Sequence, residues 1–246
     1  MDHRNTGNQA DERLRSQTIP EESLNSNPSR WFKKHYLTLI NGILALYVFL
    51  ALLAPILMKV GSTRAADFIY RIYQASCHQL AFRSFFLFGE QAVYPRELAA
   101  IEGLKTYEQV TGNDSEDNQA ARAFRGNEQL GYKTALCQRD LAIYGSLLIF
   151  GVIFALTKRR LKPLPWYLWI LLALVPIGLD GFSQLISQMK LPFLSGLLIR
   201  ESTPWLRVSS GSMFGWFTAW FGLPTIEEIV NEPKKTVYIA RKGERD

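Results

Sequence analysis

The sequence contains few of the residues that carry out most enzyme chemistry. Its 246 residues include only two cysteines, Cys77 and Cys137, and three histidines, His3, His35 and His78. Neither cysteine belongs to a CxxC pair, which argues against a dithiol oxidoreductase. The sequence has no HExxH zinc-peptidase motif, glycine-rich phosphate loop, dinucleotide fingerprint or hydrolase triad. It therefore gives no support to the familiar classes of soluble enzyme.

Four long stretches of the sequence contain no charged residues. Residues 37–58, 141–157, 163–179 and 208–226 contain no Asp, Glu, Lys, Arg or His. A helix that crosses a bilayer needs about 20 predominantly apolar residues, with about 17 as the lower limit. We therefore predict an all-α integral membrane protein, built as a bundle of four transmembrane helices. The expected spans are about 37–58, 141–157, 163–186 and 207–226, within a membrane domain of residues 36–226, and a partly helical outer segment, 59–140, joins the first two spans.

The positive residues indicate how the helices are oriented. The net charge is +6, and Lys and Arg recur in the N-terminal tail 1–35, in the connection 158–162 and in the C-terminal tail 227–246. Four spans place these three segments on one side, and short basic segments mark the cytoplasmic side. We therefore expect cytoplasmic termini in the cell membrane of a bacterium, with a disordered N-terminal tail. The basic clusters then reflect topology, with the lipid bilayer and not a nucleic acid as the partner.

A group of polar residues is expected to meet at the outer ends of the spans. The spacing of Cys137, Asp140 and Tyr144 puts them on one face of the second span. Ionisable residues at membrane depth are costly unless they are paired or hydrated, so they are candidates for function. The alternative is that they are helix-end charges that extend to the lipid headgroups. The candidate ligand-binding residues are Arg83, Arg139, Asp140, Tyr144, Asp180, Gln184, Arg200, Glu201 and Arg207.

The two cysteines allow three interpretations. A Cys77–Cys137 disulfide is consistent with an oxidising outer compartment. Alternatively, Cys77, His78, Cys137 and Asp140 form a site for zinc or another soft transition metal. In the third interpretation both cysteines are small buried residues without such a role. No other cofactor is indicated.

The same segments resemble a known family. Cys77-His78-Gln79, the piece from Cys137 to Asp140, and Pro176–Gln184 are similar to the prokaryotic predicted membrane proteins of the domain-of-unknown-function family numbered twenty eighty-five. The resemblance runs from about residue 70 to 224. Many members have a second cysteine where this chain has Asp140. The family implies a multi-pass membrane protein and highlights the same residues, without an established activity.

Three functional hypotheses follow. The preferred one is a membrane protein whose outer polar pocket binds a small polar ligand, a metal ion or a lipid headgroup. The second is a membrane enzyme that acts on a lipid-linked or quinone substrate through His78 or Cys77; no catalytic residue is otherwise identified. The third is a structural or assembly subunit, in which the polar residues hold helices together, as a homo-oligomer or with a membrane-complex partner.

Overall fold

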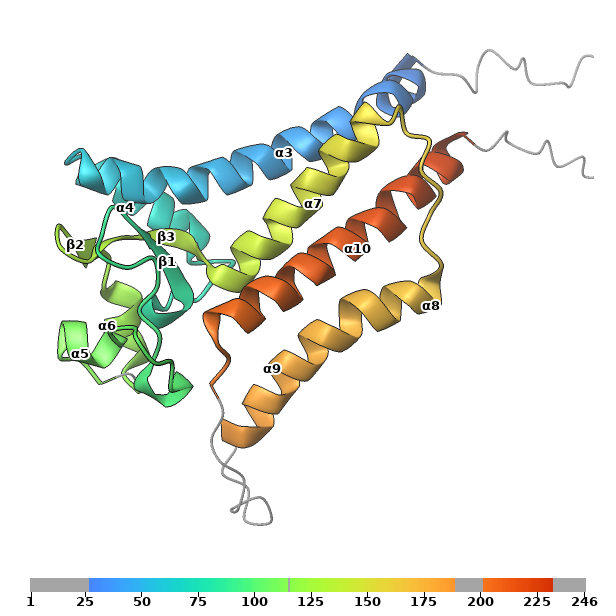
Figure 1. Ribbon diagram of the computed structural model, residues 1–246. Coiled ribbons are helices and arrows are strands. Elements are labelled where there is room, and N and C mark those ends of the chain that lie inside the picture. Colours follow the sequence, from blue (N-terminus) through green and yellow to red (C-terminus); the bar gives the residue numbers. More distant parts are fainter. Residues whose placement is uncertain (1–26, 115, 189–200, 232–246) are drawn as a thin grey trace, which may run out of the picture.

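Long helices dominate the structure, a computed structural model that describes residues 27–114, 116–188 and 201–231. They are α3 (Asn27–Lys59), α7 (Gln138–Leu156), α10 (Pro204–Asn231) and a composite helix. The composite helix consists of α8 (Trp166–Trp169), the π-helical η3 (Ile170–Leu174) and α9 (Val175–Gln188). The wide π turn precedes Pro176, which has no N–H to donate to the carbonyl of Leu172. Figure 1 shows α10 between α7 and the composite helix, with α3 on the other side of α7.

Three of the described helices are long and apolar enough to cross a membrane: Trp31–Lys59, Gln138–Leu156 and Trp166–Ile186. They correspond to the first three expected spans. Residues 207–226 are helical within α10, but α10 is not among these three helices. Large apolar side chains such as Ile43 and Leu179 are about two-thirds exposed on the helix surfaces, at 68% and 67%. Such surfaces are costly in water and suit a bilayer. Helix α3 already begins at Asn27, inside the expected tail 1–35, and residues 1–26 lie outside the described part.

Helix α10 packs closely along α7 through a row of small residues. Gly211, Gly215 and Ala219 follow one another at intervals of four, and all three are buried. A Cβ atom at Gly211 would lie 2.7 Å from the carbonyl oxygen of Arg139. One at Gly215 would overlap the carbonyl oxygen of Ile143 and the hydroxyl of Ser146. Small residues at this spacing let the backbones of two helices approach closely, as is common between membrane helices.

Residues 60–137, which we call the loop domain, form a small mixed unit at one end of the helices (Figure 1). A three-stranded antiparallel sheet, in the order β1-β3-β2, makes up its centre. The strands are β1 (Ser84–Leu87), β2 (Gly126–Asn127) and β3 (Gly131–Cys137). The all-α prediction is therefore wrong in this domain. The surrounding helices are α4 (Thr63–Tyr73), α5 (Tyr107–Thr111) and α6 (Asn118–Ala123), with short 3₁₀ turns η1 (Ala81–Arg83) and η2 (Glu97–Ala99).

A buried lysine holds the loop domain together. The Lys133 side chain on β3 is fully buried, and its Nζ donates to the carbonyl oxygens of Gln79 and Arg122, each at 2.7 Å. The hydroxyl of Tyr70 on α4 donates to the carbonyl oxygen of Lys133 at 2.5 Å. Burial lowers the pKa of Lys133 to about 7. These bonds fix the segment that follows α4, and with it the position of Cys77 and His78.

Candidate functional site

A polar cavity of about 240 Å³ lies where the loop domain meets the ends of α7, α9 and α10. Hydrogen bonds from two helices hold the domain against them. Gln138 on α7 donates to the carbonyl oxygen of Ser84 at 3.0 Å, and Arg207 on α10 donates to that of Phe82 at 3.4 Å. The cavity is lined by Ser76, Cys77, His78, Gln79, Leu80, Arg83, Cys137, Arg139, Asp140, Gln184 and Arg207.

A buried glutamate holds three arginines beside this cavity. The Glu201 side chain is 1% exposed and forms an ion pair with Arg207 of α10, whose side chain is 4% exposed. It also pairs with Arg83 at 3.1 Å and with Arg96 at 3.5 Å, both from the loop domain. The guanidinium groups of Arg83 and Arg96 in turn stack near the ring of Phe82. Glu201 thus joins Arg207 to two arginines that lie more than 100 positions earlier in the sequence.

A second buried carboxylate, that of Asp180, pairs with another arginine of the cavity. Asp180 on α9 forms an ion pair with Arg139 on α7 and accepts a hydrogen bond of 2.9 Å from the hydroxyl of Ser202. The Asp180 side chain is 5% exposed, so the charge is tolerated only because it is paired. Among the described residues, the Nε atoms of Arg139 and Arg96 are buried without a hydrogen-bond partner.

The two cysteines lie together on one wall of the cavity as free thiols. The backbone N–H groups of Cys137 and Gln79 point at the sulfur of Cys77, at 3.3 and 3.5 Å. A hydrogen bond from Cys137 lowers the pKa of Cys77. The same bond, together with burial, raises the pKa of Cys137. Cys137 caps the N-terminus of α7, where its sulfur accepts from the N–H of Asp140 at 3.5 Å.

The ligating atoms of Cys77, Cys137 and Asp140 all lie within 4.8 Å of one another. They are the only residues that form such a group among the described cysteines, histidines and carboxylates. His78 lines the same cavity but is exposed and does not belong to the group. If a metal binds here, these three residues are therefore its candidate ligands.

The structure brings most of the candidate residues together and separates a few. Asp180 and Glu201 lie behind the cavity wall as partners of its arginines, and do not line it. Tyr144 packs edge-on against Tyr47, with ring centroids 4.8 Å apart, and does not line the cavity. Arg200 lies outside the described residues. The eight candidates that line the cavity are Cys77, His78, Arg83, Cys137, Arg139, Asp140, Gln184 and Arg207.

Besides Ser76, Gln79 and Leu80 of the cavity lining, two residues that pair with the site's carboxylates were not expected from the sequence. Arg96 completes the arginine group around Glu201, and Ser202 binds Asp180. Arg96 follows Pro95 in an irregular segment, so no periodic pattern points to it. Ser202 directly follows Glu201, and its position beside a charged candidate residue is the one feature of the sequence that could have pointed to it.

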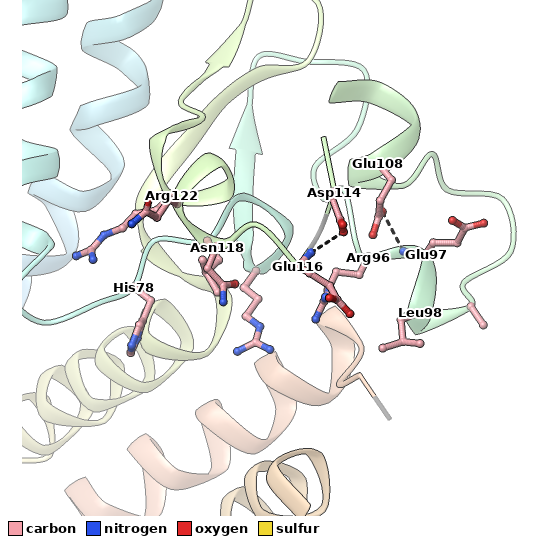
Figure 2. Close-up of a pocket in the computed structure, with 13 residues that line it drawn as sticks. His78, Arg96, Glu97, Leu98, Glu108, Asp114, Glu116, Asn118 and Arg122 are labelled. Carbon is pink, nitrogen blue, oxygen red and sulfur yellow. Dashed lines mark hydrogen bonds between the residues drawn. The ribbon is translucent and has the colours of Figure 1, made fainter. Parts of the chain in front are cut away.

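A larger cavity of about 1220 Å³ adjoins the polar one, and the two share His78, Leu80 and Arg83 in their walls. Figure 2 shows His78 at one end of the larger cavity and Glu97 and Leu98 at the other. Its acidic residues are partly used in local bonds: Glu108 accepts from the N–H of Glu97 at 3.0 Å (Figure 2). We call this cavity the vestibule, because it adjoins the polar cavity and shares part of its wall.

The comparisons with known proteins agree with a membrane assignment. Residues 118–221 match the family described as "Predicted membrane protein (DUF2085)", which confirms the resemblance over the segment from α6 to α10. The chain is 26% identical over 206 residues to "Uncharacterized protein MJ1492" of the archaeon Methanocaldococcus jannaschii, which covers 80% of this chain and 96% of the relative. No solved structure matches.

Proposed function

We propose that this chain is a four-span membrane protein whose polar cavity binds a small oxyanion, such as a phosphate group. The observation that carries the proposal is the convergence of Arg83, Arg139 and Arg207 on one cavity from η1, α7 and α10. Arginine presents a planar set of N–H donors that fits phosphate and carboxylate oxygens in a bidentate way.

Around the arginines, the charges of the described residues favour an anion. Four guanidinium groups, those of Arg83, Arg96, Arg139 and Arg207, face only three carboxylates, those of Asp140, Asp180 and Glu201. One positive charge therefore remains in a partly buried place, where an unbalanced charge is costly. The buried Nε atom of Arg139, which lines the cavity, adds a donor that lacks an acceptor. A bound anion would relieve both deficits.

The volume of the cavity limits the size of the ligand. At about 240 Å³ it lies below the 300–1000 Å³ that is usual for drug-sized ligands. A phosphate ion or the headgroup of phosphatidic acid fits this limit, whereas a nucleotide or a quinone ring system with its tail does not. The proposed ligand chemistry is therefore a phosphate group, free or as part of a lipid.

In the proposed topology α10 is the fourth span and both termini are cytoplasmic, in the cell membrane. Its 28 residues are about 42 Å long at 1.5 Å per residue, enough to cross the roughly 30 Å hydrocarbon core. Of the serines and glycines that dilute its hydropathy, Ser210, Gly211 and Gly215 are buried and do not face lipid, whereas Ser209 is exposed. The loop domain and the cavity would then lie on the outer side. Reporter fusions after residues 114 and 160 test this arrangement; the same side for both would contradict it.

The binding test uses the full chain in detergent, with two probes. Isothermal titration with inorganic phosphate, and separately with dihexanoyl phosphatidic acid, is compared between the wild type and Arg83→Gln. Arg83 is the best position because Glu201 retains Arg96 and Arg207 as partners. We expect saturable binding of at least one probe and a loss of tenfold or more in Arg83→Gln. Arg71→Gln removes an exposed arginine of α4 that lines neither cavity and should bind like the wild type. Wild-type protein that binds neither probe would refute the proposal.

A structural role is the second candidate, because the same ion pairs tie α10 to the loop domain. Glu201 and Arg207 together contact Arg83, Arg96 and the carbonyl of Phe82. A purely structural cluster predicts that Arg83→Gln lowers the melting temperature while neither phosphate probe binds the wild type. Such a result would favour this role over ligand binding.

A further inference from the structure

The lining of the polar cavity includes two thiols and a carboxylate whose ligating atoms lie within 4.8 Å of one another. We propose that Cys77, Cys137 and Asp140 bind one Zn²⁺ ion, with a fourth coordination position that opens into the cavity. The metal site rests on these three residues alone and does not require the oxyanion.

Backbone N–H donors point at both sulfurs, an arrangement that suits a metal-bound thiolate. The sulfur of Cys77 receives the N–H groups of Cys137 and Gln79, at 3.3 and 3.5 Å. The sulfur of Cys137 lies at the N-terminus of the 19-residue helix α7, where the N–H of Asp140 points at it and the helix dipole favours negative charge. Arg139 and Arg207 line the same cavity and add positive charge nearby.

The geometry requires only a small adjustment. Zinc–sulfur bonds of about 2.3 Å and zinc–oxygen bonds of about 2.0–2.2 Å place the donors of a tetrahedral site roughly 3.3–3.8 Å apart. The three ligating atoms now lie up to 4.8 Å apart, and a movement of about 1 Å would bring them into that range. Cys77 and Cys137 come from a loop and a strand end joined by hydrogen bonds, so their spacing is already restricted.

The donor set selects the class of metal. Two thiolates with one carboxylate suit a borderline ion such as Zn²⁺, whereas Mg²⁺ and Ca²⁺ prefer oxygen ligands throughout. Three protein ligands with an open position are typical of zinc sites that bind a further small ligand. All three residues line the cavity, so the open position faces its interior. That the oxyanion itself occupies this position rests on the proposed function.

The vestibule offers a route for a cation. Glu97, Glu108, Asp114 and Glu116 line it, and it shares the wall at His78 with the polar cavity. Figure 2 shows these carboxylates on the side of the vestibule away from His78. Arg83, Arg96 and Arg122 line the same cavity, so the four carboxylates leave an excess of one negative charge, which gives cations only a weak attraction.

The test titrates the full chain, purified in detergent under reducing conditions and freed of metal by a chelator. The probe is Co²⁺ alone, followed by displacement with Zn²⁺. We expect one Co²⁺ per chain, a near-ultraviolet thiolate-to-cobalt absorption band, and complete loss of the band on adding Zn²⁺. Reduced wild-type protein that binds less than 0.1 equivalent of Co²⁺, or binds it without the thiolate band, overturns the proposal.

Variants make the assignment specific. Cys77→Ser and Asp140→Asn should weaken Co²⁺ binding by at least tenfold, with unchanged helical circular dichroism. Asp67→Asn is the matched control, because Asp67 is a loop-domain carboxylate with a 45% exposed side chain that pairs with Arg125 away from the cavity. Equal affinity in all three variants would overturn the proposal. Phosphate binding by the metal-free protein is measured in parallel, so that failure of the metal site and failure of the oxyanion site give different results.

Discussion

Replacing Glu201 by Gln is expected to destabilise the protein strongly, because three arginines depend on this carboxylate. The Glu201 side chain is 1% exposed, and those of Arg207, Arg96 and Arg83 are 4%, 14% and 30% exposed. Removing one partner of a buried ion pair costs about 3–5 kcal/mol, since the remaining charge stays buried without compensation. For a chain of this size that corresponds to a fall of roughly 6–20 °C in melting temperature.

The measurement is thermal unfolding of the detergent-purified protein, followed by tryptophan fluorescence. Glu90→Gln is the matched control, because Glu90 also pairs with a cation, at 2.7 Å from Lys105, but its side chain is 44% exposed. Water screens that pair, so its loss should leave the melting temperature unchanged. The contrast separates the effect of burial from the effect of having an ion pair.

A double variant tests whether Glu201 and Arg207 act together. Removing both charges should cost less than the sum of the two single changes, because neither partner is then left alone in a buried place. The reasoning is refuted if Glu201→Gln melts within 2 °C of the wild type, or if the two single effects simply add.

Two further predictions concern the packing and the loop domain. Gly215→Ala should lower the melting temperature, because its Cβ would overlap backbone and side-chain atoms of α7. Gly222→Ala should leave the melting temperature unchanged, because there is open space around Gly222. Equal melting temperatures for the two variants would contradict the close contact between the helices. Because burial lowers the pKa of Lys133 to about 7 from the ordinary 10.5, the folded protein binds fewer protons than the unfolded chain between these values. The free energy of unfolding should therefore rise from about pH 7 to pH 10 in the wild type and lack this rise in Lys133→Met. Denaturant titrations across that range check the difference, and parallel pH profiles would argue against a buried lysine.

The sequence predicts the long elements well, because absence of charge over about 20 residues is a strong local signal. The helices α3 and α7 and the composite helix coincide with the first three expected spans. The small sheet could not be predicted in the same way. Strand β1 has four residues, and its alternating burial is not matched by alternating polarity in the sequence Ser-Phe-Phe-Leu. Strand β3 contains Lys133 within a buried run, so it shows no alternation either.

The sequence predicted many of the residues that line the candidate site, but not which arginine pairs with which carboxylate. The expected depth of the charged residues brought Arg83, Arg139, Asp140 and Arg207 to one level, and the structure places all four on one cavity. Which arginine meets which carboxylate depends on the contact of the loop domain with α10. That contact joins Arg83 to Glu201, 118 residues later, and no local pattern encodes it. Arg96 was missed for the same reason.

An experimental structure of the full chain in lipid, determined with phosphate present and at a resolution that shows bound ions, tests the account most directly. We predict non-protein density within hydrogen-bond distance of the guanidinium groups of Arg83, Arg139 and Arg207, with the loop domain outside the lipid belt. A cavity filled by the protein's own side chains, or arginines that point away from it into solvent, would contradict the account.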